Sequence, residues 1–159
     1  MGVVGFTGHQ NLIGVTRRQI AHAIAEQLVY VRGDEFTGVT SLAAGADQIF
    51  AFCVLAAGGR LEAVIPSDGY RDTMQDTDQA HFDLLLTLST ATEHLPFSTP
   101  TNEAYLTAGQ RVVKKCDLLL AVWDGRPAAG LGGTADIVAY ARHQGTEVHV
   151  IWPPGAQRT

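Results

Sequence analysis

The sequence predicts a doubly wound α/β domain, a mostly parallel sheet of about six strands with helices on both faces. Two observations predict this class. Apolar runs of strand length alternate along the chain with segments whose apolar residues recur at three- and four-residue steps. The runs are apolar at nearly every position and not at every second one, which is typical of parallel strands covered on both faces.

The size and composition fit one globular domain. The chain has 159 residues, of which 46% are hydrophobic and 17% are charged. This length is enough for a domain with its own core. We expect a single domain over residues 1–154. Trp152-Pro153-Pro154 is expected to lead into a frayed tail over residues 155–159.

The first part of the chain predicts a central strand and a helix. The apolar run 3–6 ends at Thr7-Gly8-His9 and is expected to be the first, central strand. A helix is expected over 17–31, with Thr16 as its N-cap. One face of this helix is apolar, and the residues that form it are Ile20, Ala23, Ile24, Leu28 and Val31.

The next segments continue the alternation. Residues 36–41 are expected to be the second strand, and the small-residue loop 42–47 enters a helix over about 46–57. Gly58-Gly59 ends that helix. Residues 61–65 are the expected third strand, which Pro66 closes.

The middle and the end follow the same pattern. We expect a loop over 66–75, a helix over 78–88 and a short fourth strand over 92–95. A helix over 102–115 comes next, because its apolar residues recur at roughly helical intervals. The remaining expected elements are a fifth strand over 118–123, a helix over 135–142 and a sixth strand over 147–151.

A glycine-rich loop joins the fifth strand to the last long helix. Asp124-Gly125 ends the strand, and the loop that follows contains Gly130, Gly132 and Gly133 before Thr134 opens the helix. Glycines let the backbone approach an anion, and the free N–H groups and dipole of a helix N-terminus favour negative charge. The segment therefore indicates a phosphate site. The alternative is a tight connection in which the glycines only make the turn.

Three such loops are expected to meet. In a doubly wound sheet, ligands bind beyond the carboxyl ends of the strands, where the winding reverses. The loops after the first, second and fifth strands should therefore converge on one crevice. They carry Thr7-Gly8-His9, Gly45-Ala46-Asp47 and residues 130–134 respectively.

These motifs resemble a known superfamily. Thr7-Gly8-His9, the segment 41–47 (SLAAGAD) and the segment 130–136 (GLGGTAD) occur in this order after their strands. The set looks like the SLOG superfamily, the Rossmann-like group that includes the DNA-processing protein DprA and the Lonely-guy (lysine-decarboxylase-like) phosphoribohydrolases. The resemblance covers nearly the whole chain. It implies a nucleotide or nucleotide derivative as ligand, its phosphate at the last glycine loop, and a homo-oligomer.

The sequence departs from the Lonely-guy pattern at the catalytic position. That pattern, GGxGTxxE, ends in a Glu that takes part in cleaving an N-glycosidic bond, and its position here is Ile137. Ile cannot attack an anomeric carbon or stabilise an oxocarbenium ion. We therefore expect binding, as a sensor or carrier. The alternative is a nucleotide phosphoribohydrolase in which Glu103 or Asp136 replaces the missing Glu.

The binding site is expected to draw on all three loops. His9 is interpreted as a donor to phosphate or ribose, or as a loop-packing histidine. Asp47 either contacts the ligand or stabilises a helix N-terminus. Arg126 follows the fifth strand and suits a bidentate contact to phosphate. The full set expected to bind ligand is Thr7, Gly8, His9, Ala44, Gly45, Asp47, Asp124, Gly125, Arg126, Gly130, Gly132, Gly133 and Thr134.

Three further features have two readings each. Tyr70 and Arg71 follow the third strand and form either a surface loop or a base-stacking and phosphate contact. Asn102 and Glu103 precede a helix and form either an N-cap pair or, through Glu103, a contact to the site. Arg111 lies in the middle of that helix and is expected either on a solvated face or as an ion-pair partner.

Charge and side-chain spacing bear on partners and cofactors. The formal charge is 11 − 16 = −5, and no Lys or Arg cluster exceeds a pair. Single-stranded DNA binding of the DprA kind is therefore the less favoured reading, because it needs clustered cations. No zinc or other metal spacing, Walker loop or GxSxG elbow occurs. We expect no required cofactor beyond the nucleotide-type ligand, no membrane contact and a cytoplasmic location.

Overall fold

A computed structural model describes residues 2–10, 12–31, 35–127 and 132–158. The described residues form a sheet of six parallel strands in the order β5-β4-β3-β1-β6-β7. This is the doubly wound α/β class that the sequence predicts. The strands are β1 (Gly2–Gly8), β3 (Phe36–Thr40), β4 (Arg60–Ile65), β5 (Ala91–His94), β6 (Leu118–Val122) and β7 (Glu147–Ile151).

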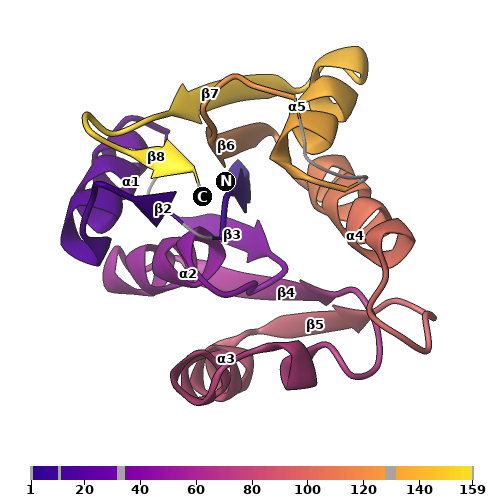
Figure 1. Cartoon of the computed structure of the whole chain (residues 1–159). Coiled ribbons are helices and arrows are strands. Elements are labelled where there is room, and N and C mark those ends of the chain that lie inside the picture. Colours follow the sequence, from indigo (N-terminus) through magenta and orange to yellow (C-terminus); the bar gives the residue numbers. More distant parts are fainter. Residues whose placement is uncertain (1, 11, 32–34, 128–131, 159) are drawn as a thin grey trace.

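Helices cover both faces of this sheet (Figure 1). Helices α1, α2 and α3 lie on one side and α4 and α5 on the other, as their packing against each other and against the strands shows. A short 3₁₀ turn, η1 (Arg71–Thr73), lies within the loop after β4. The helices are α1 (Arg17–Val31), α2 (Ala46–Ala56), α3 (Asp76–Leu88), α4 (Asn102–Lys115) and α5 (Thr134–His143).

The winding reverses at β1, which is the central strand as predicted. The chain runs from β1 outward through β3, β4 and β5, then returns to the other side of β1 with β6 and β7. Val4 pairs with Gly38 of β3 on one side and with Leu118 of β6 on the other. The carboxyl ends of β3, β1 and β6 are therefore neighbours, and the loops that leave them meet.

Local sequence accounts for the best-predicted helices. At the start of α1, the Thr16 hydroxyl accepts a hydrogen bond from Gln19 N, and Gln19 Oε1 accepts one from Thr16 N. This reciprocal pair is a capping box. At α4 the N-cap is Thr101, whose hydroxyl accepts from Ala104 N, so Asn102 and Glu103 are the first helical residues and not an N-cap pair.

The core lies on both faces of the sheet. All five residues of β3 and all five of β6 are buried. One cluster packs α1 and α2 on the sheet around Ile24, Leu28 and Phe50, and another packs α4 and α5 around Val112 and Ile137. Strands such as β6 are apolar at every position because helices pack on both faces of the sheet.

The C-terminal residues differ from the frayed tail that the sequence predicts. Gln157 and Arg158 form strand β8 (Gln157–Arg158), which pairs antiparallel with β2 (Leu12–Ile13). β2 lies in the loop after β1, a segment expected to be irregular. Two residues per strand are too few for a periodic signal, so only the tertiary pairing defines this ribbon. Within the described ranges, no helix combines the length and apolar character needed to cross a membrane.

Candidate ligand-binding cavity

A cavity of about 320 Å³ lies beyond the carboxyl ends of the central strands. The loops after β1, β3 and β6 meet there, as predicted, together with the loop after β4 and one face of α4 from Asn102 to Val112. Its walls are formed by Phe6, Thr7, Gly8, His9, Gln10, Ser41, Ala43, Asp47, Pro66, Tyr70, Asn102, Tyr105, Ala108, Gly109, Val112, Gly132, Gly133, Thr134 and Ile137.

The N-terminus of α5 opens into this cavity. Gly133 is the N-cap residue and provides no side chain to cap the helix. Gly132, Gly133 and Thr134 line the cavity, and Thr134 is buried. No described residue accepts a hydrogen bond from the backbone N–H of Gly133, Thr134 or Ala135. These donors and the helix dipole make this wall suited to an anion.

Asp136 holds the loop that precedes α5. Its Oδ2 accepts a hydrogen bond from Gly132 N at 2.9 Å. The carboxylate is therefore turned back onto its own loop, and Asp136 is not among the residues that line the cavity. This hydrogen bond holds the backbone of Gly132 in place beside the N-terminus of α5, so Asp136 positions the loop.

Gly132 must be glycine for two reasons. Its φ is +85°, a left-handed conformation that favours glycine. A Cβ at this position would lie 2.8 Å from Leu106 N and 2.9 Å from Asn102 O. The loop thus packs its backbone directly on the first turn of α4, and this contact brings α4 into the cavity wall.

The loop after β3 contains two left-handed residues. Gly45 has a φ of +89°, and a Cβ there would lie 2.3 Å from Gln10 O, so the loops after β1 and β3 touch through their backbones. Leu42 is the non-glycine exception, with a φ of +57°. Complete burial of its side chain and the hydrogen bond from its N to Thr40 Oγ1 stabilise this strained conformation.

Asp47, in the first turn of α2, is a buried carboxyl on the cavity wall, with 7% of its surface exposed. Its Oδ2 accepts a hydrogen bond from Ala43 N at 3.2 Å. Burial raises the pKa of Asp47 to about 7, although hydrogen bonds from Ala43 N and the Thr40 hydroxyl act in the opposite direction. Asp47 therefore changes its charge near neutral pH.

An aromatic wall faces this carboxyl. Tyr70 is 5% exposed, and its ring centroid lies 6.1 Å from that of Tyr105 and 5.9 Å from that of Phe82. Burial, followed by the negative charge of Asp47, raises the pKa of Tyr70, so this phenol stays neutral. Tyr70 belongs to the cavity and not to a plain surface loop. Tyr105 was not a predicted site residue, and its helical spacing carries no sign of this role.

His9 lies on the other side of the cavity. Its Nε2 is 3.6 Å from Asp124 Oδ1, and both side chains are about nine-tenths buried. The edge of the His9 ring faces Trp152, with ring centroids 5.8 Å apart. His9 thus lines the cavity and also packs against Trp152. Asp124 is not a lining residue, and its link to the cavity is its contact with His9.

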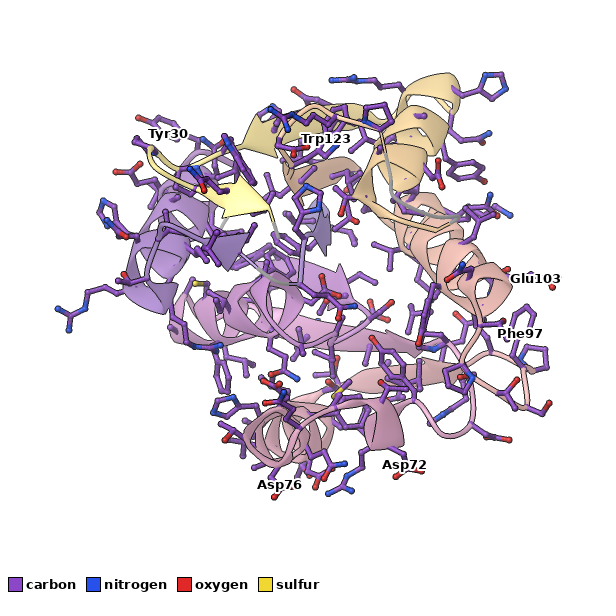
Figure 2. All side chains as sticks on the ribbon, in the orientation of Figure 1. Tyr30, Asp72, Asp76, Phe97, Glu103 and Trp123 are labelled. Carbon is purple, nitrogen blue, oxygen red and sulfur yellow. The ribbon has the colours of Figure 1, made fainter. Side chains whose placement is uncertain are left out.

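Several predicted residues lie outside the cavity lining. Ala44 and Gly45 shape the loop after β3, while Gly125 and Arg126 are exposed. Arg126 contributes its carbonyl, which accepts from Trp123 Nε1 at 2.8 Å. Gly130 lies outside the described residues. Glu103 is exposed on α4 and points outward at the edge of the molecule (Figure 2).

Other neighbours of the site have structural partners. Arg71 forms an ion pair with Asp83 at 2.8 Å, so it does not face the cavity. Arg111 forms an ion pair with Glu93 and is partly buried, which confirms the ion-pair alternative and not the solvated face. Across the described ranges, no three His, Cys, Asp or Glu side chains lie close enough together to hold a metal ion.

Among the comparisons with known proteins, only the comparison of structures found similar proteins. No protein-family model and no curated protein sequence matches this chain. The X-ray structure of DprA from Streptococcus pneumoniae superposes with a TM-score of 0.66 at 17% identity, covering 94% of this chain and 50% of that one. DprA from Helicobacter pylori gives a TM-score of 0.63 at 17% identity, covering 93% and 64%.

A third structure, the molybdenum cofactor carrier protein of Chlamydomonas reinhardtii, gives a TM-score of 0.52 at 18% identity, with 94% of this chain and 75% of that one covered. The chain spans about half the length of the S. pneumoniae DprA structure. At these identities the likeness concerns the fold, and it extends over nearly all of this chain.

Proposed function

We propose that this chain, which has a SLOG-type Rossmann-like fold, binds a nucleotide or nucleotide derivative in the cavity between the loops after β1, β3 and β6. The observation that carries the proposal is the N-terminus of α5. It has no side-chain cap, and Gly132, Gly133 and Thr134 open it into the cavity. The phosphate of the ligand binds at these N–H groups.

The remaining walls suit the rest of a nucleotide. Polar side chains such as His9, Ser41 and Asn102 line the cavity with hydroxyl, ring-nitrogen and amide groups for a sugar. Tyr105 offers a half-buried aromatic face on which a base stacks. A volume of about 320 Å³ is at the small end of ligand sites, which favours a mononucleotide-sized ligand over a dinucleotide.

A role as a sensor or carrier fits the apolar side of the cavity. Ile137, at the position of the Lonely-guy Glu, is 2% exposed and packs into the cluster between α4 and the sheet. A carrier role also has a counterpart among the structural neighbours, one of which carries the molybdenum cofactor.

Thermal unfolding against a ligand panel tests the proposal. The panel contains AMP, GMP, cyclic nucleotides, ADP-ribose, NAD and ribose 5-phosphate. A ligand at a hundred times its Kd adds about 2.7 kcal/mol, which raises Tm by about 5–10 °C for a domain of this size. A flat panel contradicts the proposal.

Gly133→Val tests the position of the phosphate. Gly133 has φ −71° and ψ 172°, so valine fits the backbone and its side chain would occupy the helix N-terminus. We expect binding to be lost with little change in Tm of the free protein. Gly2→Val is the matched control, because Gly2 lies at the far end of β1 with nothing within 4 Å of a new Cβ. Unchanged affinity in Gly133→Val would contradict this placement.

Two other activities have separate tests. Hydrolysis of the N-glycosidic bond predicts release of free base from the ligand that the panel identifies, and lack of release excludes it. Single-stranded DNA is bound by the H. pylori relative. The described residues that line the cavity include no Lys or Arg, which disfavours that ligand. A gel shift at low salt separates these cases.

A further inference from the structure

The cavity combines an anion-binding helix end with one carboxyl group. Asp47 is the only Asp or Glu, and His9 the only basic side chain, among the described residues that line it. No lysine or arginine is present there to neutralise either Asp47 or a phosphate. A phosphorylated ligand and an ionised Asp47 would therefore share a small, partly desolvated cavity in which His9 is the only described lining side chain that could carry a counter-charge.

We propose that the Asp47 carboxyl takes up a proton when the ligand binds in this cavity, and that the site prefers a ligand with a single phosphate group. This inference rests on the proposed function. Beyond the proposed function, it specifies that Asp47 is protonated when the ligand is bound and that the ligand has one phosphate group.

The position of Asp47 fixes the carboxyl in the cavity. It is in the first turn of α2, its Oδ2 is bound to Ala43 N at 3.2 Å, and only 7% of the residue is exposed. The carboxyl cannot turn outward to place its charge in water without breaking this contact. Since ionised groups lose hydration on burial, protonation is the remaining way to lower the electrostatic cost of a nearby phosphate.

The other ionisable groups that face Asp47 are few. The loop after β1 contributes His9, the segment after β4 contributes Tyr70, and α4 contributes Tyr105. Helices α1 and α3, which pack against α2 on its other sides, contribute no lining residue. Both phenols have a raised pKa because they are partly or wholly buried, so they stay uncharged. Among the described lining residues, His9 is thus the one other side chain that could take up a proton.

Asp47 ionises in a pH range in which it can take up a proton when the ligand binds. Burial raises its pKa to about 7, so the unliganded protein contains both forms near neutral pH. A bound phosphate raises this pKa further, because it disfavours the ionised form. By linkage, binding takes up a proton, and affinity increases as pH falls. A di- or triphosphate adds negative charge that protonation of one carboxyl does not offset and for which the described lining residues include no Lys or Arg, so it should bind less well.

Isothermal titration calorimetry with AMP at pH 6.5 and 8.5 tests the inference. We expect the wild type to bind about tenfold more tightly at pH 6.5, since one linked proton allows up to a tenfold change per pH unit. Repeating the titration in two buffers with different ionisation enthalpies counts the protons taken up. ADP and ATP are expected to bind more weakly than AMP.

Two variants identify the proton acceptor. Asp47→Asn keeps an oxygen that can accept from Ala43 N but cannot ionise, and it is expected to lose most of the pH dependence. His9→Gln is expected to keep it, whatever its effect on affinity. Because the phosphate of AMP itself titrates near pH 6, each variant is compared with the wild type in the same buffer. Should Asp47→Asn not fold, the proton count of His9→Gln gives the answer.

The outcomes separate the two proposals. If AMP binds and Asp47→Asn retains the pH dependence of the wild type, or if no proton is taken up, this inference is overturned and the proposed function stands. The same holds if ATP binds more tightly than AMP. If AMP, GMP and ribose 5-phosphate all fail to bind at both pH values, the proposed function fails and this inference fails with it.

Discussion

Ile137 of α5 packs into the space that Gly109 leaves on α4. A Cβ added at Gly109 would lie 2.2 Å from Ile137 Cδ1 and 2.7 Å from its Cγ1. Both residues line the cavity. The contact lets the two helices approach each other and gives this wall of the cavity an apolar surface.

Gly109→Ala is expected to destabilise the protein by about 1–3 kcal/mol. Alanine improves helix propensity, but its methyl group overlaps two atoms of Ile137, and overpacking of this kind outweighs propensity. Chemical denaturation with urea measures the change. Gly2→Ala, where a Cβ meets nothing within 4 Å, is the control and should be near neutral. The double variant with Ile137→Val or Ile137→Ala should recover part of the loss; no recovery would contradict the stated contact.

Gly45→Ala and Gly58→Ala separate backbone strain from close approach. Both glycines have positive φ, of +89° and +83°. A Cβ at Gly45 would lie 2.3 Å from Gln10 O, whereas one at Gly58 meets nothing within 4 Å. Gly58→Ala should therefore cost about 1–2 kcal/mol of strain alone. Gly45→Ala should cost more and should also weaken ligand binding. Equal losses, measured by urea denaturation, would count against a contact between the loops after β1 and β3.

The stability of the protein should depend on Asp47 in a defined pH range. The pKa is raised from 3.8 to about 7 by burial, so the folded state keeps a proton that the unfolded state loses between these values. The contribution to the free energy of unfolding is therefore present below about pH 4 and is lost as pH rises toward 7, by an amount on the order of 4 kcal/mol.

Urea denaturation of the wild type and Asp47→Asn at pH 5, 6, 7 and 8 checks this sign. Other groups titrate in both proteins, so the difference between them isolates Asp47. The wild type should lose stability relative to Asp47→Asn as pH rises. Parallel curves would mean that Asp47 does not titrate in this range in the folded protein.

Asp136→Ala and Asp136→Asn test whether this residue positions the loop or takes part in catalysis. The carboxylate accepts from Gly132 N, and an asparagine oxygen can replace it as the acceptor. Asp136→Ala should weaken ligand binding by roughly tenfold, in line with the loss of one hydrogen bond from a charged acceptor. Asp136→Asn should bind nearly as well as the wild type. A base-releasing activity that is lost in Asp136→Asn with binding intact would instead assign Asp136 to catalysis.

Long periodic segments and capping signals were predictable from the sequence. The expected bounds of α1, α4 and β7 are those of the structure. Thr16 and the residues around 102 mark helix starts, and Gly145 before the β7 run and Pro153 after it are residues that end strands. The convergence of the loops after β1, β3 and β6 also follows from sequence, since strand order in a doubly wound sheet determines which carboxyl ends meet.

Residues placed by tertiary packing were not predictable. Tyr105 reaches the cavity because the Gly132 backbone lies against the first turn of α4, a contact between segments far apart in sequence. Arg126 appeared suited to phosphate by its place after β6, yet the chain turns it to solvent. Gln157 and Arg158 are strand residues only because β2 offers an edge.

The pairing of β1 has a consequence for the order in which the protein folds. β1 precedes the other strands along the chain, but Val4 pairs with Gly38 on one side and with Leu118 on the other. The second pairing closes a loop that contains most of the chain, which is slow. β8 then meets β2 from the far end of the sequence. A folding species that contained only β1, α1 and β3 would lack α5, so a ligand that binds at the N-terminus of α5 should stabilise only the fully assembled state.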